Sequence, residues 1–109
     1  MLVNCTNHEI LVDLGDMLLG VKPSGNVARV ILEQEKVDSY ENISIFRSLP
    51  TSVIKGLPEL DSQNLYIVSS TVAQAARLPN IVCPNHAPNQ CTRDHHGRII
   101  SVKSFLRYD

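Results

Sequence analysis

The stretch NLYIVSSTVAQAARLP, residues 64–79, places an apolar run directly before three hydroxyl residues and a short alanine-rich segment. The apolar run predicts a buried strand. The pattern Thr71-x-x-Gln74 matches a capping box, which predicts a helix capped by Thr71, and Pro79 ends it because the residue before a proline avoids helical geometry. A helix of about two turns does not persist alone, so we expect small apolar side chains to hold it against a sheet. These side chains are Val72, Ala75 and Ala76.

Short strand-like segments fill most of the remaining chain. Several alternate apolar and polar residues, as half-buried antiparallel strands do, and turns at Gly15, Gly25 and Gly97 separate some of them. The segments are residues 1–6, 9–14, 16–23, 26–38, 43–48, 52–56, 80–84 and 98–108. We therefore expect an α+β fold: a twisted antiparallel sheet or partly open β-barrel of about six to eight strands with one short helix.

Length and composition restrict the kind of protein this is. A chain of 109 residues is the size of one domain, so residues 1–109 are expected to form a single α+β domain. A net charge of -1 argues against binding to duplex nucleic acid, and no apolar stretch reaches the roughly 20 residues that cross a bilayer. Three cysteines and an N-terminus without a signal-peptide pattern predict a cytoplasmic protein with no membrane partner.

Further landmarks follow one another in a distinctive order: NCTNHEI, PSGNVARV, GLPEL, LYIVSSTVAQAA and RDHHGRIISVKSFLRY. This order resembles a family of small, mostly uncharacterised bacteriophage and prophage proteins, which typically read NLTPH, PSG.VARV, GLPEP, YIVS..VA.A and RDE.GRIIG. The resemblance covers nearly the whole chain. The chain departs from the pattern at Cys5 and Asn7, where the family tends to have Leu and Pro. It also departs at His95 and His96, where an acidic residue is usual.

The start of the predicted helix is the first candidate ligand site. Free backbone N–H groups and the positive end of the helix dipole favour an anion there, and Ser69, Ser70 and Thr71 add hydroxyl donors. Simple helix capping explains the same residues, and no glycine-rich phosphate loop accompanies them. Both interpretations remain open from the sequence.

Cationic side chains supply the other candidate ligand-binding residues. Arg29 lies within an apolar strand pattern, and a buried arginine needs an acid such as Asp94, a ligand or solvent at the rim of the sheet. Arg93, Arg98 and His8 complete the set. The guanidinium group suits phosphate because it donates two parallel hydrogen bonds.

The segment CPNHAPNQCTRDHH offers a possible zinc site. Its candidate ligands are Cys83, His86, Cys91, His95 and His96. Their spacing matches no common zinc finger, and in the resembling family the histidine pair aligns with a plain hairpin turn. We therefore expect a solvated turn, free thiols and no bound metal or other cofactor.

The sequence contains no Ser-His-Asp order with supporting context and no dinucleotide fingerprint, so we expect a protein that is not an enzyme. The phage resemblance and the basic and hydroxyl residues together favour a binding protein that sequesters a small phosphorylated, nucleotide-like signal of host antiviral defence. The alternative is a structural or protein-interaction module, an accessory phage protein without such a ligand. A small core with few aromatic residues further predicts a homo-oligomer, a dimer or higher.

Overall fold

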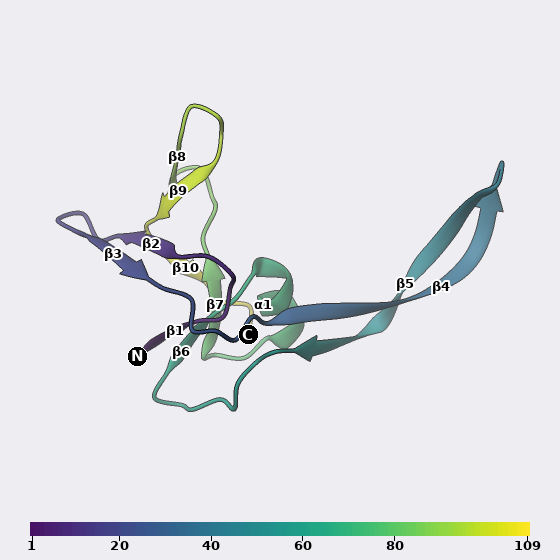
Figure 1. The fold of residues 1–109 in the computed structure, drawn as a ribbon, viewed down its shortest axis with the longest axis horizontal. Coiled ribbons are helices and arrows are strands. Elements are labelled where there is room, and N and C mark those ends of the chain that lie inside the picture. Colours follow the sequence, from purple (N-terminus) through teal and green to yellow (C-terminus); the bar gives the residue numbers. More distant parts are fainter.

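The fold consists of ten strands and one helix, arranged as a layered body from which a long hairpin projects (Figure 1). The structure, a computed structural model, describes the backbone of residues 1–109 and the side chains of residues 1–49 and 53–109. The elements in chain order are β1 (Leu2–Asn4), β2 (Ile10–Asp13), β3 (Leu18–Val21), β4 (Arg29–Tyr40), β5 (Ile43–Lys55), β6 (Leu65–Ile67), α1 (Ser70–Ala76), β7 (Ile81–Pro84), β8 (Cys91–Arg93), β9 (Ile99–Val102) and β10 (Phe105–Leu106).

The strands form three separate sheets. One has the order β1-β6-β7-β10, the second β3-β2-β9-β8, and β4 pairs only with β5. The expected α+β class is confirmed, but none of these sheets closes into a barrel. Strand direction also differs from the antiparallel prediction, because β1 pairs with β6 and β6 with β7 in parallel.

The first sheet is the middle layer of the body. Tyr66 and Ile81 contribute to a core with helix α1, whereas the alternate positions Ile67 and Val82 contribute to a second core with the β3-β2-β9-β8 sheet. Strands β6 and β7 are therefore covered on both faces, which explains why their sequences are continuously apolar rather than alternating.

Helix α1 begins earlier than the sequence predicts. Ser69, not Thr71, is the capping residue: its Oγ accepts a hydrogen bond from the backbone N–H of Val72 at 3.4 Å. The capping-box assignment of Thr71 and Gln74 is therefore wrong, because the hydroxyl one turn before the buried Val72 is that of Ser69. This change in register also turns Ala75 outward and buries Ala73 instead.

The β4–β5 hairpin, which we call the arm, gives the molecule an elongated shape. The radius of gyration is 16.6 Å, compared with about 13 Å for a compact domain of this length. Residues 43–48 and 52–56, expected as two strands, belong largely to the single strand β5. Within the part of the chain that the structure describes, α1 is the only helix, and it is not long and apolar enough to cross a membrane.

Candidate ligand-binding cleft

A cleft of about 470 Å³ opens at one edge of the body's middle sheet. The strands β1, β6 and β7 run parallel, so their carboxyl ends meet at the same edge, and the segment that follows each strand contributes to the cleft. Ligands commonly bind outside the carboxyl ends of parallel strands, because the loops there diverge and leave space. The lining residues are Cys5, Thr6, Asn7, His8, Ile10, Val27, Ala28, Arg29, Val68, Ser69, Ser70, Pro84 and His86.

The cleft brings together four of the seven predicted ligand-binding residues. His8 follows β1, Ser69 and Ser70 follow β6, and Arg29 begins the arm. Thr71 is exposed on the first turn of α1 and does not line the cleft. The cleft thus joins residues that are up to about sixty positions apart in the sequence.

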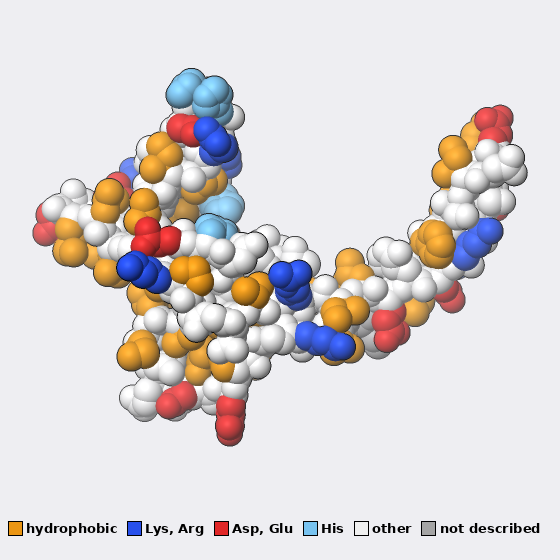
Figure 2. Space-filling view, viewed as in Figure 1, with side chains coloured by type: hydrophobic (Ala, Val, Ile, Leu, Met, Phe, Trp, Pro, Cys, Tyr) orange, Lys and Arg blue, Asp and Glu red, His pale blue; other side chains and the backbone are white. Residues whose placement is uncertain are grey.

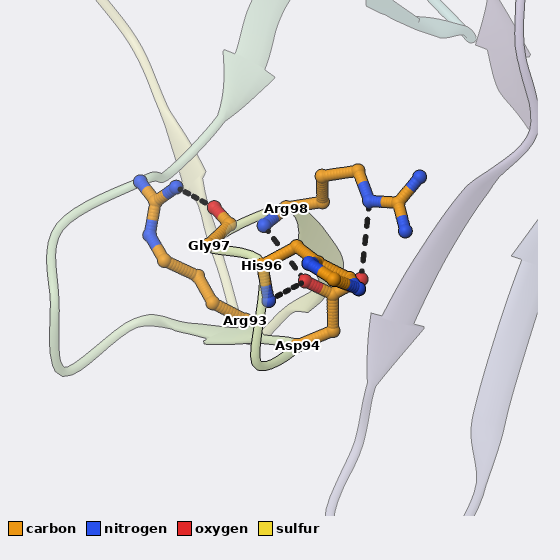
Figure 3. A network of polar contacts seen from close by, with 5 residues as sticks. All are labelled: Arg93, Asp94, His96, Gly97 and Arg98. Carbon is orange, nitrogen blue, oxygen red and sulfur yellow. Dashed lines mark hydrogen bonds and ion pairs between the residues drawn. The ribbon is translucent and has the colours of Figure 1, made fainter.

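Arg93 and Arg98 lie outside the cleft, on the β8–β9 hairpin (Figure 3). Arg93 donates a hydrogen bond from Nη1 to the backbone oxygen of Gly97 at 2.7 Å, and the Nε of Arg98 lies 3.2 Å from Oδ2 of Asp94. Asp94 also accepts from the backbone N–H groups of His96 and Arg98. Both arginines therefore stabilise a tight turn, and the pairing of Asp94 with Arg29 considered from the sequence does not occur.

The cleft has a basic lining. Arg29, His8 and His86 are its ionisable groups besides Cys5, and no carboxylate is among its lining residues. Arg29 makes no ion pair with any described side chain, and its cross-strand neighbour is Lys55. The guanidinium group is exposed, so it is available to an anion without breaking a structural contact.

A buried asparagine holds one wall of the cleft in place. The side-chain N–H groups of Asn4 donate to the backbone oxygens of His8 at 2.9 Å and Val21 at 2.8 Å. Its Oδ1 accepts from the backbone N–H and the hydroxyl of Thr6, at 2.9 and 2.6 Å. The amide group thus holds the loop of residues 5–8 in place through hydrogen bonds to Thr6 and His8. Sequence reasoning missed this role, although an Asn followed two residues later by Thr is a common turn pattern.

The thiol in the cleft is poorly suited to act as a nucleophile. Cys5 is fully buried by its neighbours, and this burial raises the pKa of its thiol, with partial opposition from a hydrogen bond with Ser24. The reactive form of cysteine is the thiolate, so a raised pKa makes Cys5 less reactive at neutral pH. The Nδ1 of His8 lies 3.1 Å from the Oδ1 of Asn7.

A smaller hollow of about 280 Å³ adjoins the cleft. The two share His8, Ile10, Pro84 and His86, and the smaller hollow adds Glu9 and the apolar side chains of β9. The two histidines therefore border both spaces, whereas Arg29 lines only the larger one and Glu9 only the smaller one.

The predicted zinc candidates do not converge. Among the residues that the structure describes, no group of three or more His, Cys, Asp or Glu side chains is arranged to hold a metal ion. Cys83 is buried in the core beneath α1, whereas the rings of His95 and His96 lie against each other at the hairpin turn, tilted by 44° with centroids 3.9 Å apart. The Sγ of Cys91 lies 3.6 Å from the backbone oxygen of His86.

Comparisons of this chain with protein-family models, with curated proteins and with solved structures gave no match. The function is therefore argued from the geometry of the cleft.

Proposed function

We propose that this chain is a non-catalytic binding protein that sequesters a small phosphorylated, nucleotide-like molecule. The observation that carries the proposal is the meeting of Arg29, His8 and His86 in one cleft without a lining carboxylate. A phosphate group needs positive charge and several hydrogen-bond donors, and the hydroxyls of Thr6, Ser69 and Ser70 line the same space. The volume of about 470 Å³ lies within the usual range for small-molecule sites.

The adjoining hollow explains why a nucleotide suits the site better than a bare phosphate. A nucleotide has an anionic end and a flat, largely apolar base; Arg29 lines only the larger space, and the apolar side chains of β9 line only the smaller one. Glu9 in the hollow suits the hydroxyl or amino donors of a nucleoside. The phosphate would face Arg29, and the base would lie towards β9.

The biological part of the proposal rests on the resemblance to bacteriophage and prophage proteins. A phage protein that binds a nucleotide without destroying it removes that molecule from solution, so the expected target is a signal of host antiviral defence. Binding without catalysis is consistent with the neutral Cys5 thiol and with a larger cleft that no carboxylate lines.

The experiment is a titration with a panel of mononucleotides, cyclic mononucleotides and cyclic dinucleotides, followed by thermal shift and calorimetry. Nucleosides and inorganic phosphate serve as reference ligands. We expect at least one nucleotide to raise the unfolding temperature in proportion to the logarithm of its concentration, because it binds only the folded state. The nucleoside lacking phosphate should bind much more weakly.

Two arginine variants locate the site. Arg29→Ala should weaken binding of that nucleotide about tenfold or more, since it removes a hydrogen bond between charged groups. Arg98→Ala, on the hairpin outside the cleft, should leave the affinity unchanged. Equal losses in both variants, or no stabilisation by any nucleotide, would contradict the proposal.

The second candidate, a structural or interaction module, is favoured by the exposed arm rather than by the cleft. It predicts that no nucleotide changes the unfolding temperature. Mass spectrometry of compounds released by denaturing the protein purified from infected cells separates the two, since only the first predicts a phosphorylated compound.

A further inference from the structure

The arm carries an unusual share of the exposed apolar surface. Of the fifteen large hydrophobic side chains exposed among the described residues, eight lie on it, although it forms about a quarter of the chain. Figure 2 shows hydrophobic side chains along the whole length of the projecting hairpin. The eight exposed side chains are Ile31, Leu32, Val37, Tyr40, Ile43, Ile45, Phe46 and Val53.

An arm of this kind gains little stability from its own chain. A two-stranded hairpin is marginal in water, because neither face is covered and each strand leaves one row of backbone groups unpaired. The arm packs against helix α1 only where it leaves the body, through Val30 and Ile54. Beyond that point every described side chain of β4 is exposed. A covering partner would stabilise both the exposed side chains and the free strand edges.

The charges of the arm indicate what kind of partner fits. Four basic and four acidic residues lie between positions 29 and 55, so the arm is neutral overall and unsuited to a strongly charged partner such as nucleic acid. The basic pair Arg29 and Lys55 lies opposite each other at the base, whereas Asp38 and Glu41 lie near the tip. Figure 2 shows acidic side chains at the free end and basic side chains near the body.

The charges of one arm match those of a second arm that points in the opposite direction. If two arms lie side by side in opposite directions, the acidic tip of each meets the basic base of the other. Near the middle, Glu35 and Arg47 already pair within one arm, with Nε and Oε1 3.8 Å apart. A two-fold axis through the middle of the arms therefore joins identical surfaces without bringing like charges together at either end.

The size of the arm is adequate for such an interface. Twelve residues of strand extend roughly 40 Å, and two strands present an outline of about 400 Å² on each face. A standard interface buries about 800 Å² of accessible surface on each partner. Exposed apolar side chains lie on both faces of the arm, since neighbours such as Ile31 and Leu32 point to opposite sides of a strand, so either face together with one strand edge can contribute to such an interface.

We propose that the arm is a dimerisation element that pairs in an antiparallel, two-fold arrangement with the arm of a second copy of this chain. The proposal concerns assembly and does not depend on the cleft binding a nucleotide. The two can fail separately, because assembly is measured by mass and ligand binding by titration.

The first test is the mass of the full chain in solution by size exclusion with multi-angle light scattering at about 100 μM, where a moderate affinity populates the dimer. We expect twice the chain mass of 12.1 kDa. The variant Ile43→Asp/Ile45→Asp should be monomeric, because it places unpaired charge on the apolar face near the tip. Both positions are already exposed, so circular dichroism should show that the body remains folded.

A matched control separates the arm from exposed apolar surface in general. Leu14→Asp/Met17→Asp alters two similarly exposed side chains at the β2–β3 turn and should keep the dimer mass. A monomeric native chain, an assembly other than a dimer, or a native mass retained by Ile43→Asp/Ile45→Asp would overturn the proposal. So would complete loss of the dimer in the control variant.

A charge exchange tests the direction of pairing. Glu41→Lys at the tip and Lys55→Glu at the base should each weaken the dimer, about fivefold, because each replaces an attraction by a repulsion. The double variant Glu41→Lys/Lys55→Glu should recover most of the native affinity. If the double variant instead loses as much dimer affinity as the two single variants together, the antiparallel arrangement would be overturned. If the chain is monomeric and binds a different protein instead, the proposal that its partner is a second copy of itself would be overturned.

Discussion

At the scale of single residues, Asn4 has the largest consequence for the cleft. Its side chain is 1% exposed and uses both N–H donors and its oxygen on the loop that follows β1 and on β3. A buried amide with all its partners supplied fixes a loop more firmly than an apolar side chain, because each partner would otherwise be left unsatisfied.

The substitution Asn4→Ala tests this role. It removes the partners of two backbone oxygens and of the Thr6 backbone N–H, so we expect the free energy of unfolding to fall by about 3 kcal/mol. Urea denaturation followed by circular dichroism measures the change. Asn26→Ala, at an exposed asparagine in the next loop, should cost less than about 0.5 kcal/mol. If the two variants unfold at the same urea concentration, Asn4 does not hold the loop.

The single residues that form the cleft show what the sequence can reveal. Chemical type selected His8, Arg29, Ser69 and Ser70, because cations and hydroxyls stand out against apolar strands, and these four residues line the same cleft. The same criterion wrongly grouped Arg93 and Arg98 with them. Their partners, the Gly97 backbone oxygen and Asp94, lie within a turn of five residues, and such local pairing removes them from the cleft.

At the scale of elements, Gly56 joins the arm to the cleft. It follows β5 with a φ of +86°, and a Cβ at this position would lie 2.0 Å from the backbone oxygen of Val27. Val27 lines the cleft and directly precedes the segment that enters β4. The close approach of these two backbones therefore sets both the direction of the arm and one side of the cleft.

Gly56→Ala should consequently be more harmful than an ordinary glycine substitution. We expect the free energy of unfolding to fall by about 3 kcal/mol or more, since the steric overlap adds to the strain of a positive φ. Gly25→Ala is the matched control. It has a φ of +101° with open space around its Cβ, so only the strain of about 1–2 kcal/mol remains. Equal losses in the two variants, measured by urea denaturation, would show that the backbone at Val27 yields easily.

The sequence predicted local turns better than it predicted which strands pair. The hairpin turns at Gly15 and Gly97 were predicted correctly, because positive φ favours glycine locally. The parallel pairing of β1, β6 and β7 was not, since β1 and β6 lie about sixty residues apart and β7 joins β6 only after the chain has passed through α1. The continuous apolar runs in β6 and β7 were the available signal, as strands covered on both faces lack alternation. That pairing creates the cleft, so the site itself could not be assembled from local pattern alone.

At the scale of the whole molecule, the body and the arm differ in what their apolar side chains do. The two apolar cores of the body position the cleft, while most of the exposed apolar surface lies on the arm. The expectation of an oligomer came from the small core, and the proposal of paired arms rests instead on where the exposed apolar side chains lie. Eight of the fifteen exposed large hydrophobic side chains lie within residues 29–55, the segment that also makes the chain less compact.

The alternative to pairing with a second copy is that the arm folds back over its own body. Small-angle X-ray scattering of the monomeric variant Ile43→Asp/Ile45→Asp distinguishes these outcomes. An extended arm should give a radius of gyration near the 16.6 Å of the structure, whereas an arm packed on the body should approach about 13 Å. We expect the larger value, because β4 and β5 pair along their whole length and the backbones of Gly56 and Val27 approach closely where the arm leaves the body. A value near the compact limit would mean that the body itself covers the apolar face, and pairing between two arms would then have no driving force.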